Sequence, residues 1–329
     1  MVQKKNPKLF EVFSIKFEPS LRKHRGKGLS AISSSVLAVD KLSDISPLFF
    51  TSLLQVVIAC FLFHVYSVGV NQLFDVEIDK INKPYLPLAS GEYSFGTGVI
   101  ITISFLILSL GFSWAVGSWP LFWTLFSLVV LTSGYSVNVP LLGWKRHGIT
   151  ATICIALQAT LSQIGYFLHM QNHVFKRPTV FPRSQLFAIP FFGLLGIIIS
   201  QLKDLPDIEG DRKDGVKNLA MLIGLKPVFW TCISLLEIAY GVSIMVGLSS
   251  PYLWSKIITM WPQGRSDAGF TFSVPVPDTR HAGGHAIMAA ILWYRAKSVD
   301  LENSASTYSF YVLIWKLGSA EHLLVPFVR

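Results

Sequence analysis

The chain is organised as long apolar runs separated by short polar segments. A helix that crosses a bilayer needs about 20 mainly apolar residues. Seven runs reach or approach this length, and we expect a transmembrane helix in each of them: Ser46–Val70, Phe95–Gly117, Trp119–Asn138, Gly148–His169, Gln185–Leu202, Val228–Leu248 and Thr307–Val328. The pattern therefore predicts an all-α polytopic membrane protein.

Two further spans have an unusual pattern. The run Leu29–Val39 is only about half as long as a span, and it follows a basic N-terminal segment, residues 1–28, which is a candidate remnant of a targeting segment. The other span is split into Tyr252–Trp261 and His285–Ala296 by a segment rich in proline, glycine and charge. Such a composition does not continue a helix. We therefore predict a polar insertion at residues 261–283, with a functional loop outside the membrane as the alternative.

The composition agrees with a membrane location. Of the 329 residues, 51% are hydrophobic and 14% are charged, whereas about a quarter of the residues of soluble domains are charged. The mean hydropathy is +0.50. These values exclude an ordinary water-soluble domain and a disordered chain. The cysteines Cys60, Cys154 and Cys232 lie inside apolar runs, where packed thiols are expected rather than redox or metal chemistry.

The distribution of positive charge predicts the orientation. The net charge is +9, but the basic residues lie at the edges of apolar runs, so they indicate membrane topology and not a nucleic-acid partner. Counting crossings from Ser46 places residues 71–94, 138–147, 203–227 and 294–306 on one side, with eleven Lys or Arg, against five on the other. By the positive-inside rule the first side is cytoplasmic, or stromal or matrix in an organelle.

Acidic residues are concentrated in two windows. Eight of the nineteen Asp and Glu residues lie in the first acidic window (residues 71–79) and the second acidic window (residues 203–214). Four expected spans separate the windows, so both should emerge on the same side of the membrane. We expect that they meet across one cavity.

Helical spacing would place the acids of each window on one helix face. Asn71, Asp75 and Asp79 recur at i, i+4, i+8, and Asp204, Asp207 and Asp211 recur at i, i+3, i+7. Carboxylates at the C-terminal end of a helix repel one another and face the negative end of its dipole. Mg²⁺ would remove this penalty, and it prefers a few carboxylates together with phosphate oxygens. The pattern therefore predicts a magnesium-bound diphosphate substrate.

Basic residues beside the windows could hold the phosphate oxygens directly. The candidates are Lys83, Lys203, Arg212 and Lys213. The alternative is ordinary solvated charge, which we favour for Lys213 and for Asp214 of the second window.

The motifs NQLFDVEIDKINKPYLPLASGEYS and KDLPDIEGDRKDG resemble the two signature motifs of the UbiA superfamily of intramembrane aromatic prenyltransferases. The part NKPYLPLASGEYS is similar to the plant enzymes that prenylate homogentisate, flavonoids and coumarins. The resemblance extends from about Ala38 to the C-terminus. It implies one domain over residues 29–329, with about nine transmembrane helices around a central cavity that opens to lipid and is capped by both motifs.

The resemblance also implies roles for individual residues. Metal binding is expected at Asp75, Asp79, Asp207 and Asp211, with Asn71 beside them, and two Mg²⁺ ions would hold the prenyl diphosphate. Lys83 and Lys203 would contact phosphate, as Arg212 would from its place beside the acids. Asp204 would orient or deprotonate the acceptor, and Tyr135 and Asn138 would line the pocket.

The activity implied is Mg²⁺-dependent transfer of a prenyl group from a prenyl diphosphate to an aromatic carbon of a phenolic acceptor. We favour dimethylallyl diphosphate with a flavonoid, isoflavonoid or coumarin, because the second motif, DIEGDRKDGVKNLA, has drifted from the homogentisate form. The alternatives are a homogentisate phytyl or geranylgeranyl transferase, a membrane transporter with intramembrane acids, and an inactive variant. The expected location is the plastid membrane with the Asp motifs on the stromal side, although Glu11 and Glu18 are unusual in a plastid signal.

A few other polar residues have more ordinary interpretations. His64 could touch the acceptor, or it could be a hydrogen-bonded core residue. His169 and His173 have the spacing of a metal pair, but they fall on the opposite side from the acidic windows, so we expect a loop there. Lys316 and Glu321 are expected to make interhelical contacts.

Overall fold

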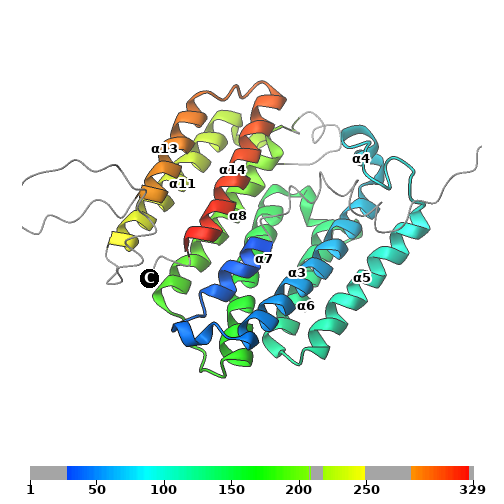
Figure 1. Cartoon of the computed structure of the whole chain (residues 1–329). Helices are drawn as coiled ribbons and strands as arrows, with labels where there is room; N and C mark the ends of the chain where they lie inside the picture. The colour runs from blue at the N-terminus through cyan, green and yellow to red at the C-terminus, as the bar shows by residue number, and fades with distance from the viewer. Residues whose placement is uncertain (1–27, 207, 209–217, 249–282, 326–329) are drawn as a thin grey trace, which may run out of the picture.

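The computed structural model describes residues 28–206, 208, 218–248 and 283–325, and these residues contain helices and connections but no strand. The long helices form an up-and-down bundle (Figure 1): α3 (Pro47–Phe74), α5 (Phe95–Ala115), α6 (Trp119–Ser136), α7 (Gly148–Leu168), α8 (Arg183–Asp204), α11 (Leu225–Leu248), α13 (Gly283–Lys297) and α14 (Ser304–Leu324). Shorter elements are α4 (Val76–Asn82), α10 (Leu219–Ile223), the 3-10 helices η1 (Leu42–Asp44) and η2 (Trp144–Arg146), and the π-helix η3 (His169–Val174). The prediction of an all-α polytopic bundle is confirmed.

Five of the described helices are long and apolar enough to cross a membrane: α3, α5, α7 continued into η3, α8 and α11. The described parts of the two unusual spans are helical: residues 28–36, and Gly283–Lys297 as α13. Most of the basic N-terminal segment, the apolar run Tyr252–Trp261 and residues 261–282 of the expected insertion lie outside the described residues.

Serine caps and one glycine turn fix where the helices begin. The Ser46, Ser94 and Ser118 side chains each accept a hydrogen bond from the backbone N–H three residues later. Such a cap satisfies one of the unpaired N–H groups at a helix N-terminus. Between α5 and α6, Gly117 adopts φ +72°, a conformation that favours glycine, so the chain reverses within a few residues.

Helix α5 buries a face of small and polar residues and exposes large apolar side chains. In α5 the buried residues are Gly98, Thr102, Ser109 and Ser113, while the exposed side chains include Ile100, Ile103 and Ile107. In lipid, apolar side chains can face outward and small residues let helix backbones approach closely. This pattern is therefore the one expected for a bundle in a bilayer.

Close helix contacts occur where a glycine faces a threonine. A methyl group placed on Gly165 of α7 would collide with Thr124 of α6, and one on Gly69 of α3 would collide with Thr102 of α5. Two apolar core clusters complete the packing. One joins α3, α6 and Tyr166, and the other joins α8, α11, α13, α14 and residues 37–39.

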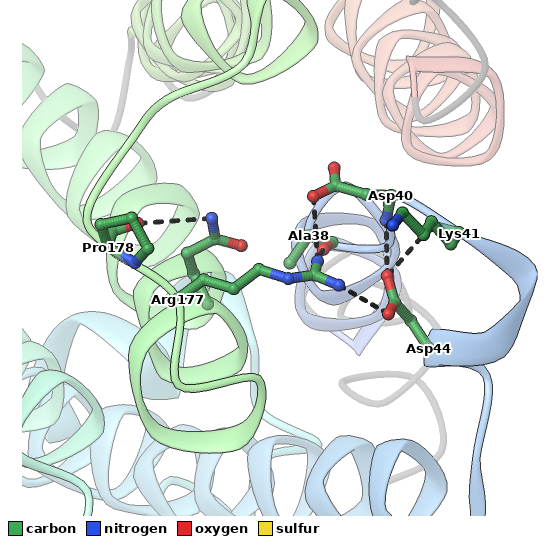
Figure 2. A network of polar contacts seen from close by, with 7 residues as sticks. Ala38, Asp40, Lys41, Asp44, Arg177 and Pro178 are labelled. Carbon is green, nitrogen blue, oxygen red and sulfur yellow. Dashed lines mark hydrogen bonds and ion pairs between the residues drawn. The ribbon is translucent and has the colours of Figure 1, made fainter.

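An ionic clamp closes the end of the bundle opposite α4. Figure 2 shows the Arg177 guanidinium between Asp40 and Asp44, with Nη1 2.9 Å from Asp40 Oδ2 and Nη2 2.6 Å from Asp44 Oδ1. Asp44 also accepts hydrogen bonds from the backbone N–H groups of Asp40 and Lys41. The clamp therefore joins the segment before α3 to the α7–α8 connection.

The polar residues of α14 differ from one another in their surroundings. Glu321 is buried, and its Oε2 lies 3.2 Å from Nε2 of the buried His285 on α13, so Glu321 makes the expected interhelical contact. Lys316 is exposed, and it forms no ion pair with another described residue.

His169 and His173 lie in η3 and not in an open loop, and the His169 Nδ1 atom lies 2.8 Å from Ser118 Oγ.

Candidate active site

The described parts of both acidic windows lie at the same end of the bundle. Helices α3 and α8 both run toward the end that carries α4, with α5 and α7 running in the opposite direction (Figure 1). The first window occupies the end of α3 and most of α4, and the second window begins in the last turn of α8. This arrangement agrees with the even number of crossings between the windows.

The first window is bent and is not one continuous helix. Helix α3 ends at Phe74, Asp75 adopts φ −117° and ψ 13°, and α4 begins at Val76. The expectation that the acids lie along one uninterrupted helix is therefore wrong at Asp75. Asn71 Nδ2 still donates to Asp75 Oδ2 at 2.9 Å, and Asp79 N–H donates to the carbonyl of Asp75 at 2.8 Å.

Asp75 is paired with a residue that the sequence analysis did not single out. Lys145 Nζ, from η2 in the α6–α7 connection, forms an ion pair with Asp75 Oδ1, and both side chains are only 15% exposed. In the sequence, Lys145 is only one of the eleven basic residues that predict the topology. Its position in a basic connection on the same side as the windows was the available signal.

Asp79 is the most buried acid of the first window. Its side chain is 5% exposed, and Lys83 Nζ lies 3.2 Å from Asp79 Oδ1. Burial raises the pKa of the Asp79 carboxyl above its ordinary value, although Lys83 opposes this shift. By contrast, Glu77 forms an exposed ion pair with Lys80 at 2.6 Å. A second positive charge is therefore directed at Asp79, while Glu77 faces away from the site.

The second window is described as far as its first residues. Lys203 Nζ donates to Tyr135 Oη at 3.1 Å and lies 3.7 Å from Asp204 Oδ1. The predicted site residues Asp207, Asp211 and Arg212 lie outside the described residues. Asn138 is exposed, two residues beyond the end of α6.

The end of α6 and the connection that follows it contact both windows. The end of α6 reaches the second window through Tyr135, and η2 reaches the first window through Lys145. The connection is folded back on α6, because Gly143 N–H donates to the Gly134 carbonyl at 2.9 Å. A side chain at position 134 would collide with the Trp144 ring. The end of α6 and the α6–α7 connection together therefore link the two windows across the end of the bundle.

Comparison with known proteins agrees with this geometry. The model of the UbiA prenyltransferase family matches residues 29–262. The chain belongs to this family.

The similarity to individual prenyltransferases is high and extends over most of the chain. Homogentisate phytyltransferase 1, chloroplastic, from Arabidopsis thaliana is 49% identical over 305 residues, which is 92% of this chain and 72% of that protein. Naringenin 8-dimethylallyltransferase 2, chloroplastic, from Sophora flavescens is 50% identical over 302 residues, which is 92% of this chain and 69% of that protein. The protein is therefore a membrane prenyltransferase, and the transporter alternative is not supported.

Solved structures share the fold. A UbiA homolog from Archaeoglobus fulgidus bound to GPP and Mg²⁺ superposes with a TM-score of 0.60 at 18% identity, over 94% of this chain and 98% of that chain. The structure of the same homolog bound to DMAPP and Mg²⁺ gives the same TM-score and coverage. At this identity the comparison establishes the architecture of the prenyltransferase.

The donor atoms of the first window fit a hard divalent cation. Asn71, Asp75 and Asp79 offer amide and carboxylate oxygens, the ligand type that Mg²⁺ prefers. Both carboxylates are largely buried, and each is paired with a lysine ammonium group, Asp75 with Lys145 and Asp79 with Lys83. Such pairing is expected for buried carboxylates that attract positive charge. Within the described part of the chain, no three His, Cys, Asp or Glu residues gather closely enough to hold a metal ion, so the site would have to include further ligands.

Proposed function

We propose that this prenyltransferase binds a prenyl diphosphate between its two acidic windows and transfers the prenyl group to an aromatic carbon of a plant phenolic. The observation that carries the proposal is that the end of α6 and the connection after it contact both windows, because Tyr135 of α6 pairs with Lys203 and Lys145 of η2 pairs with Asp75. A diphosphate is the ligand that needs cationic groups and metal-binding carboxylates at one place. The proposal is supported further by the family to which the chain belongs.

The binding roles follow from charge and position. Asn71, Asp75 and Asp79, together with Asp207 and Asp211, would hold Mg²⁺, which when bound supplies positive charge against the diphosphate. Lys83, Lys145, Lys203 and Arg212 would donate hydrogen bonds to phosphate oxygens. Tyr135 would hold the Lys203 ammonium group in place, and Asn138 would lie at the rim of the pocket.

The reaction separates charge. The bond between the prenyl C1 and the diphosphate oxygen breaks, and its electron pair leaves with the diphosphate, where the lysines stabilise the developing negative charge. The aromatic ring of the acceptor attacks the prenyl carbocation. Loss of the ring proton restores aromaticity, and Asp204 would orient the acceptor phenol or accept its proton. Apolar side chains around the site would keep water from the cation.

For the substrates, we propose dimethylallyl diphosphate and a flavonoid, isoflavonoid or coumarin acceptor. Relatives with such names include naringenin 8-dimethylallyltransferase 2 and glycinol 4-dimethylallyltransferase from Glycine max, the latter 46% identical over 305 residues. A second candidate is homogentisate with a phytyl or geranylgeranyl donor, since homogentisate phytyltransferase 1 has nearly the same identity. The chloroplastic names of these relatives support a plastid membrane, and we propose that the windows face the stroma.

A substrate panel tests the proposal. Microsomes containing the full chain would be incubated with Mg²⁺, with dimethylallyl, geranyl, geranylgeranyl or phytyl diphosphate, and with naringenin, genistein, a hydroxycoumarin or homogentisate. Product masses identify the donor and acceptor. We expect a monoprenylated flavonoid, isoflavonoid or coumarin from dimethylallyl diphosphate. Prenylated homogentisate alone would favour the second candidate, and no product from any pair would contradict prenyl transfer.

Substitution of Asp75 tests the site. Asp75→Asn should abolish Mg²⁺-dependent turnover while the protein remains folded, because the amide cannot supply the negative charge that holds the metal. Glu77→Gln is the matched control, since Glu77 is exposed and pairs only with Lys80 among the contacts described. Full activity of the Asp75 variant would rule out the proposed metal site.

A further inference from the structure

Lys316 is in an unusual place for a lysine. It lies twelve residues after Ser304, the first residue of the 21-residue helix α14, which is about 18 Å along the helix axis. Its side chain is exposed, and a charged group at that depth in a bilayer is costly unless it is paired or reaches the interface. Glu321, the nearest acid along the helix, is buried against His285. Lys316 therefore either extends to the interface or pairs with an anion that the described part of the chain does not supply.

The surface around Lys316 is a groove of about 380 Å³, a size within the range of roughly 300–1,000 Å³ that is typical of small-molecule sites. Its lining combines cationic, polar and apolar residues, from α13 and from one face of α14: Arg295, Tyr308, Ser309, Val312, Leu313 and Lys316. Helices α13 and α14 lie side by side, and their connection is at the end that carries α4 (Figure 1). The groove therefore runs from that end of the bundle along the outside of α14.

The charge of the groove has one sign. Arg295 and Lys316 line it, and no carboxylate does. Asp300 and Glu302 lie in the α13–α14 connection, outside the lining, where Asp300 Oδ1 accepts a hydrogen bond from Glu302 N–H. Among the described residues neither Arg295 nor Lys316 forms an ion pair. Both cations are thus available to an external anion.

The direction of the lysine also suits such a ligand. Side chains on a helix point toward its N-terminus, and the N-terminus of α14 is the end where Arg295 lies. A lysine can extend along apolar surface and place its ammonium group nearer the interface. The Lys316 ammonium group would then approach Arg295 over Val312 and Leu313.

We propose that this groove binds an anionic glycerophospholipid of the bilayer. The phosphate would lie between Arg295 and Lys316, and one acyl chain would lie along Val312 and Leu313. The bound molecule must carry a negative headgroup and an alkyl chain, because cationic and apolar side chains line the same groove. The proposal does not depend on the donor or acceptor proposed above.

Lipid retention tests the proposal. The full chain would be purified in mixed micelles with equimolar phosphatidylglycerol and phosphatidylcholine of the same acyl chains, and bound lipids would be counted by native mass spectrometry. We expect phosphatidylglycerol to be retained in preference. Arg295→Gln and Lys316→Gln should each lower the ratio of the two retained lipids by about five-fold, as expected for one cation at an anionic membrane surface.

Controls separate the groove from general charge and from misfolding. Lys226→Gln removes an exposed cation from the first turn of α11 at the same end of the bundle, and it should leave the ratio unchanged. Lys316→Arg keeps the charge and should keep the preference. Equal retention of the two lipids by the wild-type chain, or an equal loss of preference in the Lys226 variant, would overturn the proposal. So would displacement of phosphatidylglycerol by dimethylallyl diphosphate but not by inorganic diphosphate, which would assign the groove to the donor.

Discussion

Lys145 brings positive charge to the first acidic window from a connection 70 residues further along the chain. We predict that Lys145→Gln lowers kcat/KM by about 10- to 100-fold, because hydrogen bonds to charged groups contribute roughly 1.5–3 kcal/mol. Initial rates at varied donor concentration measure this effect. Lys80→Gln is the control, since the exposed pair of Lys80 with Glu77 should contribute little. Equal rates for the wild-type and Lys145 variants would contradict a role of Lys145 in donor binding.

Tyr135 has a more limited role, and removing its hydroxyl group alone tests that role. Tyr135→Phe removes the acceptor of the hydrogen bond from Lys203 and keeps the ring. We expect the KM for the prenyl diphosphate to rise by about 3- to 10-fold, as for the loss of one neutral hydrogen-bond partner. Tyr85→Phe, at an exposed tyrosine near the first window, should leave the KM as it is. An unchanged KM in the Tyr135 variant would show that Lys203 does not need this partner.

At the residue scale, the sequence predicts which acidic residues form the site better than it predicts their side-chain partners. The acids of both windows are recognisable because charge is rare in this chain and is concentrated there. The pairing of Asp75 with Lys145 is not predictable from spacing, because it depends on how the α6–α7 connection folds back on Gly134. The break at Asp75 was also missed, since i, i+4 spacing looks the same whether or not the helix continues through it.

At the element scale, contact between helices depends on single small residues. We predict that Gly165→Ala lowers the stability of the folded protein by about 1–3 kcal/mol, because the added methyl group would collide with Thr124 and overpack the α6–α7 contact. Thermal unfolding in detergent measures the change. Gly111→Ala is the matched control on α5, where an added methyl group meets nothing within 4 Å. Equal melting temperatures for the two variants would contradict the close α6–α7 contact.

The clamp at the opposite end should give a pH-dependent stability. Burial alone would raise the pKa of Asp44, but hydrogen bonds from Arg177 and from the backbone hold it below its ordinary value of 3.8. Because the folded-state pKa is lower than the unfolded-state pKa, the carboxylate contributes stability above pH 3.8, and this contribution is lost as the pH falls through the folded-state pKa.

The comparison of two aspartates tests this expectation. Asp44→Asn should lower the free energy of unfolding by about 1–2 kcal/mol at neutral pH, and the difference from the wild-type protein should decrease only as the pH falls below 3.8 and through the lower folded-state pKa. Asp40→Asn should have a smaller effect, because the Asp40 side chain is 54% exposed and that of Asp44 is 10% exposed. Thermal unfolding of the three proteins across pH measures both. A difference that persists in acid would contradict the clamp.

Element boundaries were predicted well where the apolar pattern is strong. The expected span Phe95–Gly117 corresponds to α5, and Gly148–His169 corresponds to α7, within two residues at each end. The end of the first of the seven expected spans was less accurate, because α3 continues past Val70 to Phe74, through the polar residues Asn71 and Gln72. Hydropathy detects burial in lipid, and it does not detect a helix that extends beyond the membrane.

At the scale of the whole molecule, the proposed reaction requires both windows to bind one ligand. The even number of crossings was sufficient to predict that they lie at the same end of the bundle, and Figure 1 agrees. The sequence could not predict which segment links them. That depends on the packing of α6 against α7, which brings Tyr135 and Lys145 to different windows.

The most direct test is an experimental structure of the full chain with Mg²⁺ and dimethylallyl S-thiolodiphosphate, an analogue that resists ionisation. The account predicts one analogue whose diphosphate oxygens are contacted by Lys145 on the side of the first window and by Lys203 on the side of the second. A diphosphate bound at the opposite end of the bundle, or one that contacts only a single window, would contradict it.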